Sequence, residues 1–470
     1  MFLYWCERLT FISLCLLIFV LPASIGGVSI FSCLAILFFL LYKTAESRLA
    51  VIRGQAWWST WKTEPSSVRL TLPLVCFVAI NFLATLWSDY PPQSRKAFVG
   101  KVLGHVFVYL AVRSAVNTPR RLRILLNILC VSAVLISLDA LFQLWSGHDL
   151  FKRASLVEGR VSAAFNHPNG LGAYLVLALP LLYGSVILYC RYWRTRAHSL
   201  LAAVMLGAGF CLSLTVMGLT YSRGAWLGLV VAAVSFMIFA RNRLAVVFLV
   251  VAVLAFMVYV QILGAYRHVS LVSENTPAAT GTIVPWQNGD SGKEPGVALP
   301  ALPQGEAQTL YSQDSIDKIY VRLVHMGLGG SDRLIYWRDA IKIVRDHPWT
   351  GTGLNTYANT IKKYNVDRGL YPHNGYLQMA AELGIFGLAI FLWFLFAHMV
   401  YGVGAGRGMD PDTNLLWNTI LAGFAGFLAH GFLDTTFYSV QHGALLWFFF
   451  GLLAAGHSLA KGSQKEPVCQ

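Results

Sequence analysis

The chain passes from a long polar segment into a long apolar one at residues 371–387, which read YPHNGYLQMAAELGIFG. The apolar stretch that follows His373 continues to about residue 401. Roughly 18 or more consecutive apolar residues are enough for a helix to cross a bilayer. This boundary therefore predicts a histidine at the N-terminal, water-facing end of a membrane helix.

Comparable apolar runs recur along the whole chain. Its 470 residues are 56% hydrophobic and 12% charged, about half the charged fraction of a soluble protein. We therefore expect an all-α polytopic membrane protein with about 12 transmembrane helices. The expected spans are roughly residues 9–23, 28–42, 70–88, 98–116, 122–145, 170–190, 199–219, 224–240, 244–264, 375–401, 414–436 and 441–460.

Alternate short loops between these spans are rich in lysine and arginine, which indicates the cytoplasmic side. They hold Lys43, Arg48, Arg53, Lys62 and Arg69, then Arg113, Arg120, Arg121 and Arg123, then Arg191, Arg194 and Arg196, and finally Arg241 and Arg243. An even number of spans then predicts that both termini are cytoplasmic. The same loops account for the net charge of +14, and we find no basic soluble domain of the kind that would bind nucleic acid.

The opposite side carries one large segment. The predicted organisation is transmembrane helices 1–9 in residues 1–264, a large external loop in 265–373, and helices 10–12 with a cytoplasmic tail in 374–470. Residues 273–320 are rich in Pro, Gly, Ala, Gln and Asn, which is typical of a flexible insertion.

Residues 331–365 of this loop are expected to be helical. Apolar residues at helical spacing predict two amphipathic helices that lie against the membrane domain or cap a cavity there. The first would bury Leu334, Trp337, Ile341 and Val344, and the second Tyr357, Ile361 and Tyr364.

Several arginines lie on the side that should contain few basic residues. They are Arg160, Arg223, Arg333 and Arg338. An arginine next to membrane spans is costly unless it faces a polar cavity or an anion, and its guanidinium suits bidentate binding of phosphate oxygens. The arginines together favour an external cavity for a pyrophosphate-bearing lipid. Each could instead reach the interface alone or pair with an acidic residue.

His373 is a candidate general base in that cavity. The positive end of a helix dipole disfavours the imidazolium form, and a neutral imidazole can accept a proton from a sugar hydroxyl. The alternative is an interfacial histidine that bonds only to backbone or water. Asp434 can orient His373 or simply pair with Arg223, and Gly384 and Gly387 are expected to let a neighbouring helix approach closely.

The sequence contains no HExxH, DxD, Walker or CxxC pattern, and its eight cysteines lie in apolar spans or near cytoplasmic ends. We therefore predict no disulfide framework, no metal site and no cofactor. Neutralisation of a diphosphate would then fall to the arginines.

Three stretches resemble the bacterial O-antigen ligase family. They are Gly159-Arg160 through Pro168-Asn169-Gly170, then Ser222-Arg223-Gly224-Ala225-Trp226, and finally Arg333-x-x-x-Trp337 together with His373-Asn374, nine residues, and Gly384-x-x-Gly387. The histidine–asparagine pair with its spaced glycines is the most specific. The resemblance covers about residues 155–390.

This resemblance implies a membrane fold like that of the integral-membrane (GT-C-like) glycosyltransferases. It also implies an enzyme of lipopolysaccharide biosynthesis in the bacterial inner membrane, with its active site facing the periplasm. The donor would be a glycan on undecaprenyl pyrophosphate and the acceptor a sugar hydroxyl of lipid A–core, among membrane lipids.

The family roles map onto particular residues of this chain. His373 would be the catalytic base, and Arg223 and Arg333 would bind pyrophosphate with help from Arg160 and Arg338. Asn374 and Asp434 would support the site. Transfer would be metal-independent and would invert the anomeric carbon, since no carboxylate pair is placed for a double displacement.

Three other functions stay open from sequence alone. An O-antigen polymerase of the same superfamily would use a second lipid-linked glycan as acceptor. A protein O-oligosaccharyltransferase is usually longer at its C-terminus. A lipid-linked glycan transporter would be expected to place its ionisable residues near the bilayer midplane rather than at one face.

Overall fold

The computed structural model describes residues 1–61, 68–157, 159–195, 197–240, 246–248, 250–251, 254–255, 333–364 and 371–465. Within these ranges the regular elements are helices, and the only extended pairings are two isolated bridges. The chain forms two compact units, one of Met1–Val253 with Asp339–Gln470 and one of Leu254–Arg338.

Ten helical segments of the described residues are long and apolar enough to cross a membrane, which confirms an all-α polytopic membrane protein. They are α1 (Phe2–Val20), α2 (Ile25–Ile52), α3 (Val68–Leu86), the continuous α4–η3–α5 (Pro91–Ala97, Phe98–Leu103 and Gly104–Ala115), α6 (Pro119–Ser146), α7 (Pro168–Arg191), α8 (Ala197–Leu219), α9 (Arg223–Ala240), α14 (Gly375–Gly406) and α16 (Val440–Lys465).

Two of the twelve expected spans are not among these ten. The eleventh corresponds to α15 (Pro411–His430), which ends six residues earlier than expected because residues 431–435 form a turn. The ninth, residues 244–264, lies largely outside the described residues.

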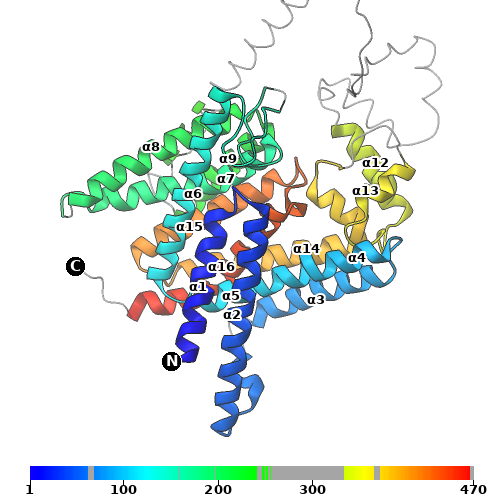
Figure 1. The fold of residues 1–470 in the computed structure, drawn as a ribbon, viewed down its shortest axis with the longest axis horizontal. Helices are drawn as coiled ribbons and strands as arrows, with labels where there is room; N and C mark the ends of the chain where they lie inside the picture. Colours follow the sequence, from blue (N-terminus) through cyan, green and yellow to red (C-terminus); the bar gives the residue numbers. More distant parts are fainter. Residues whose placement is uncertain are drawn as a thin grey trace, which may run out of the picture. The chain divides into compact units, whose positions relative to one another are not determined.

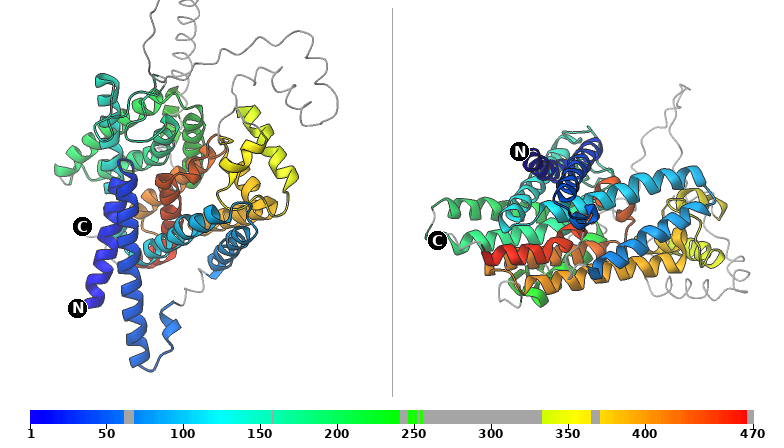
Figure 2. Two further views of the ribbon diagram at one scale, coloured as in Figure 1. Left: turned by 45° about the vertical axis from the view of Figure 1, so that its right-hand side comes forward. Right: turned by 90° about the horizontal axis from the view of Figure 1, so that it is seen from below.

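The helices of the larger unit pack in pairs that are often distant in sequence (Figure 1). α1 lies beside α2 and α3 beside α14, as both views of Figure 2 also show. α9 and α7 each pack against α15, and α5 packs against α16. α7 and α15 are mostly buried, so they form the centre of this unit.

Glycines allow the closest of these contacts. A Cβ atom on Gly426 of α15 would lie 2.4 Å from the carbonyl oxygen of Gly228 in α9. A Cβ on Gly423 would lie 2.6 Å from the carbonyl oxygen of Leu177 in α7. Only hydrogen fits at these positions, so the three backbones approach closely, as in small-residue interfaces of membrane helices.

α14 is interrupted at Gly384, whose φ is 71°. The loop that follows α12 (Arg333–Asp346) pairs with the broken helix there: Ile385 N–H donates to Pro348 O at 2.8 Å, and Gly353 N–H donates to Glu382 O at 2.9 Å. A Cβ on Gly384 would lie 2.2 Å from Trp349 O. The expectation of a close helix neighbour at Gly384 was therefore wrong, because a loop occupies that space.

The segment after this loop contains α13 (Tyr357–Thr360) and the short 3₁₀ helix η6 (Ile361–Lys363). Tyr357 and Ile361 share a small core with Ala340, Ile343 and Ala381, and Val344, Tyr364 and Leu377 pack against it. The expected inner face of the second helix is thus confirmed.

The expected inner face of α12 was partly wrong. Val344 packs inward as expected, but Ile341 is 37% exposed, because Ala340 and Ile343 supply the face that meets α13. A helix that contacts its partners along a narrow line buries only the positions on that line.

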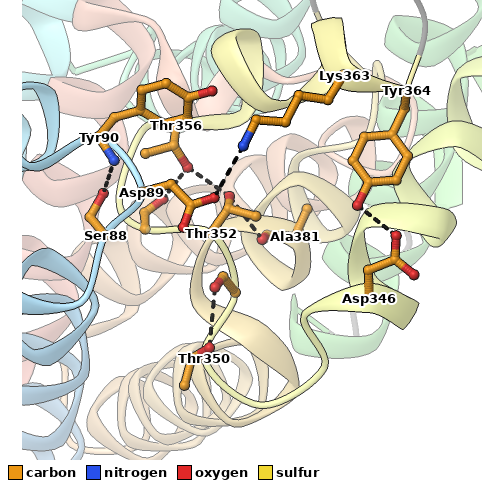
Figure 3. A network of polar contacts seen from close by, with 12 residues as sticks. Ser88, Asp89, Tyr90, Asp346, Thr350, Thr352, Thr356, Lys363, Tyr364 and Ala381 are labelled. Carbon is orange, nitrogen blue, oxygen red and sulfur yellow. Dashed lines mark hydrogen bonds and ion pairs between the residues drawn. The ribbon is translucent and has the colours of Figure 1, made fainter.

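Polar contacts join the residues between α12 and Tyr364 to the turn between α3 and α4 (Figure 3). Asp89 N–H donates to Thr352 O at 3.1 Å, and Lys363 Nζ lies 3.7 Å from Asp89 Oδ2. The Tyr364 hydroxyl donates to Asp346 Oδ2 at 2.6 Å. The segment is thus anchored to α3–α4 on one side and to α14 on the other.

Candidate active site

His373 lies just before α14, in a backbone conformation that is unusual for it. Its φ is 47°, in the left-handed region, where a residue with a Cβ atom is uncommon. Asn374 is the N-cap of the helix, and its Oδ1 accepts from Tyr376 N–H and Leu377 N–H at 3.1 and 3.0 Å. The helix thus starts after Asn374, and Pro372 is outside it.

His373 pairs with Asp434, 61 residues later in the chain. Nδ1 of His373 lies 3.3 Å from Oδ1 of Asp434. The histidine side chain is 35% exposed and the aspartate side chain 13%. A carboxylate at Nδ1 favours the tautomer with hydrogen on Nδ1 and leaves Nε2 as an acceptor. The site therefore contains an oriented imidazole with one partly exposed edge.

Asp434 is held in its ionised form. Burial alone would raise the pKa of this carboxyl, but the hydrogen bond with His373 and the electrostatic attraction of the neighbouring His430 and His373 side chains lower the pKa below its usual value. Thr435 N–H also donates to Oδ1 at 2.7 Å. Asp434 is therefore a fixed anion and not a proton donor at neutral pH.

The start of α14 is bound to the turn after α15, which fixes the His373–Asp434 geometry. Gly375 N–H donates to Gly431 O at 2.8 Å and to Asp434 O at 3.1 Å. The Tyr376 ring stacks on Phe432 with ring centres 4.2 Å apart. Both partners of the pair are thus held by backbone contacts as well as by their own side chains.

Arg160 braces the turn between α8 and α9. Its Nε donates to Thr220 O at 2.8 Å, and one terminal nitrogen donates to Asn169 Oδ1 at 2.9 Å. Asn169 lies in the first turn of α7. The first of the three stretches singled out in the sequence is therefore bound to Thr220, two residues before the second stretch, through a guanidinium whose donors partly serve the protein itself.

Arg223 is the first residue of α9 and is exposed. Ser222 precedes it and accepts from Ala225 N–H at 3.3 Å, as an N-cap does. Next to Arg223, a Cβ on Gly224 would lie 3.3 Å from Nε2 of His430 and 3.2 Å from Cβ of Leu433. The turn with Arg223 therefore packs on the end of α15, one residue from Asp434.

Arg333 and Arg338 lie in the first turns of α12, within the smaller unit. The other expected site residues, His373, Asn374, Asp434, Arg160 and Arg223, belong to the larger unit. Of these, the structure joins His373 to Asp434 directly and Arg160 to the turn that contains Arg223. Roles for Arg333 and Arg338 stay predictions.

His430 was missed at the sequence level. It ends α15, is fully buried, and acts electrostatically on Asp434. His430 lies four residues before Asp434, in the stretch His430-Gly431-Phe432-Leu433-Asp434. This spacing at the end of an expected span was the signal in the sequence that could have identified His430 as a neighbour of Asp434.

The described residues contain no cluster of three or more His, Cys, Asp or Glu side chains arranged to hold a metal ion. A search of the curated proteins gives no match to the chain. A protein-family model does match residues 208–392, a segment that includes Arg223, Arg333, Arg338 and His373, and this model describes the O-antigen ligase. The resemblance of the chain to the O-antigen ligase family is thereby confirmed over residues 208–392.

Proposed function

We propose that this membrane protein is an O-antigen ligase. It would transfer a preassembled glycan from undecaprenyl pyrophosphate to a sugar hydroxyl of lipid A–core at the periplasmic face of the bacterial inner membrane. The observation that carries the proposal is the His373–Asp434 pair, 3.3 Å apart, whose histidine lies in the family-matched segment.

In this proposal His373 is the general base. Nε2 takes the proton of the acceptor hydroxyl while that oxygen attacks the anomeric carbon. Asp434 holds Nδ1–H and stabilises the imidazolium that forms. The bond from the anomeric carbon to the pyrophosphate oxygen breaks, and undecaprenyl pyrophosphate leaves with the bonding electrons. A single displacement of this kind inverts the anomeric carbon.

The arginines would stabilise the leaving pyrophosphate. Arg223 is exposed at the start of α9, where the helix N-terminus also favours an anion. Arg333 and Arg338 are proposed to contribute from α12. Arg160 is better suited to hold the Arg223 turn in place than to bind the donor by itself, because it already donates to Thr220 and Asn169.

The test is transfer in vitro with purified protein, lipid-linked glycan and rough lipopolysaccharide. His373→Ala should abolish transfer while donor binding persists, and His198→Ala, at an exposed histidine of α8, should transfer as wild type. Wild-type transfer by His373→Ala would remove the base assignment. Activity lost with EDTA and restored by Mg²⁺ would overturn the metal-independent mechanism.

The same assay separates the ligase from the polymerase, which the family match does not distinguish. Offered both acceptors, a ligase attaches glycan to lipid A–core. A polymerase lengthens the lipid-linked glycan and leaves lipid A–core unmodified. Movement of lipid-linked glycan across liposomes without any transfer would indicate a transporter.

A further inference from the structure

A cavity of about 120 Å³ lies among α3, η3, α14 and the start of α16. Its wall is mainly apolar and aromatic, with Phe77, Phe391, Leu446 and Trp447 among the lining side chains. Phe437 also lines it and packs against Gly375, the first residue of α14. The cavity therefore lies next to the His373 site, but the proposed reaction does not use the cavity.

One cationic group, the ammonium of Lys101, lines this cavity. Lys101 belongs to η3, a six-residue π-helical segment inside the candidate membrane span Pro91–Ala115. Short π-helical segments within α-helices are frequent at functional sites. An ionisable residue inside a span is costly and generally serves a function.

The neighbours of Lys101 do not neutralise it directly. Nζ donates to Asn355 Oδ1 at 2.8 Å and to the carbonyl oxygen of Tyr438 at 3.2 Å. Both acceptors are neutral, and an ammonium has three donors. Within the described ranges no carboxylate forms an ion pair with Lys101.

The carboxylate connected to Lys101 is Glu382, and Asn355 lies between them. Asn355 N–H donates to Oε2 of Glu382 at 2.7 Å. Glu382 also accepts from Tyr357 N–H at 3.2 Å and from Gln378 at 2.9 Å. Both carboxylate oxygens of Glu382 thus already accept hydrogen bonds from Asn355, Tyr357 and Gln378. Glu382 therefore offsets the charge of Lys101 only at a distance. A cation in apolar surroundings is most stable with an anion in contact.

We propose that this cavity binds the phosphate group of a membrane lipid, with Lys101 as its ion partner and the aromatic wall against the adjoining hydrocarbon. The volume is below the roughly 150 Å³ that encloses a benzene molecule in a protein core. It suits a phosphate with its first carbon atoms and is too small for a glycan unit. This binding site does not depend on the proposed ligase activity.

The test uses the full-length protein in detergent and dihexanoyl phosphatidylglycerol as the probe, with binding measured by titration calorimetry. Lys101→Met should raise Kd about tenfold or more, as expected for the loss of one charge-assisted hydrogen bond. Lys96→Met is the matched control: Lys96 is exposed on the preceding α4, and its removal should leave Kd within about twofold of wild type.

A second variant tests the cavity without altering Lys101. Val440 lines it and is 39% exposed, so Val440→Trp can cover the cavity with little disturbance of the core. This variant should also weaken binding, and it decides the question if Lys101→Met does not fold. Unchanged binding by either folded variant would overturn the proposal.

Two further ligands identify what is recognised. Dihexanoylglycerol, which lacks the phosphate, should not bind, and binding as tight as that of phosphatidylglycerol would overturn the role of the anion. Competition by inorganic phosphate shows whether the site recognises a phosphate carried by a lipid or a free phosphate ion. No competition at millimolar concentration supports a lipid-borne phosphate, whereas Lys101-dependent competition would assign the site to free phosphate and overturn the lipid as its ligand.

Discussion

His373 combines an unusual backbone conformation with a defined side-chain partner. A left-handed φ at a residue with a Cβ atom costs about 1 kcal/mol or more and persists only where surrounding contacts impose it. Here the contacts are the hydrogen bonds of Gly375 with the turn after α15. The conformation places the imidazole beside Asp434 instead of along the axis of α14, as a positioned base requires.

Asp434→Asn should reduce glycan transfer about a hundredfold, because the amide no longer stabilises an imidazolium. Donor binding should change little, and protein stability should fall by about 1–3 kcal/mol. The measurement is initial rate and thermal unfolding of the purified variant. Transfer within threefold of wild type would contradict an orienting role for Asp434.

The pH dependence of this stability difference follows from the lowered pKa of Asp434. A carboxyl with a depressed folded-state pKa stabilises the protein above its unfolded pKa of about 4, and this contribution is lost as pH falls further. The gap between wild type and Asp434→Asn should therefore shrink as pH falls below about 4. A gap that does not shrink below about pH 4 would show that another group is responsible.

At the scale of elements, α14 is two helices joined at Gly384, with the loop from Pro348 to Gly353 bound to the break. The backbone groups released at the break are satisfied by this loop, as buried polar groups in a membrane protein must be. Glu382 adds a buried carboxylate that accepts from two backbone N–H groups of the same segment. The break therefore serves as a docking point for the loop that follows α12.

Gly384→Ala should destabilise the protein by roughly 2 kcal/mol or more. Alanine at this position would have to adopt the left-handed φ of Gly384, which is strained for a residue with a Cβ atom. Its Cβ would also lie 2.2 Å from Trp349 O. Gly404→Ala, in the second half of α14, has no atom within 4 Å of its added Cβ and should be neutral or slightly stabilising. Thermal unfolding of both variants checks this, and equal melting temperatures would contradict the close loop contact.

At the scale of the whole larger unit, the candidate site depends on the packing of α9 against α15. Gly426→Ala places a Cβ 2.4 Å from the backbone of Gly228, so the two helices must move apart. We expect reduced transfer through displacement of the Arg223 turn from the end of α15, together with lower thermal stability. Gly207→Ala, in an open position of α8, is the control and should behave as wild type.

Both termini are predicted to be cytoplasmic from the twelve expected spans. A fluorescent-protein fusion after Gln470 should fluoresce in cells, whereas an alkaline phosphatase fusion there should be inactive. Phosphatase inserted within residues 273–320 should be active, because that segment is expected in the periplasm. An active phosphatase at Gln470 would place the C-terminus in the periplasm and contradict the prediction.

The apolar pattern of the sequence predicts most of the described membrane helices but not where they end or what they contact. Apolar length alone predicts membrane spans, so the fold class follows directly. The early end of α15 at His430 and the loop at Gly384 depend on neighbours that come from elsewhere in the chain. Local pattern gives no information on such neighbours, and the buried face of α12 was partly misassigned for the same reason.

The sequence by itself determined a polytopic helical membrane protein with a histidine at the start of a late span. It also predicts basic loops on one side of the membrane, and the candidate site arginines with this histidine on the other side. It also indicated the family resemblance, through short motifs whose spacing is local. Only the tertiary structure decided that Asp434 contacts His373, that Arg160 braces the turn of Arg223, and that Lys101 lines an apolar cavity. Each of these contacts joins residues far apart in sequence, and helix packing alone brings them together.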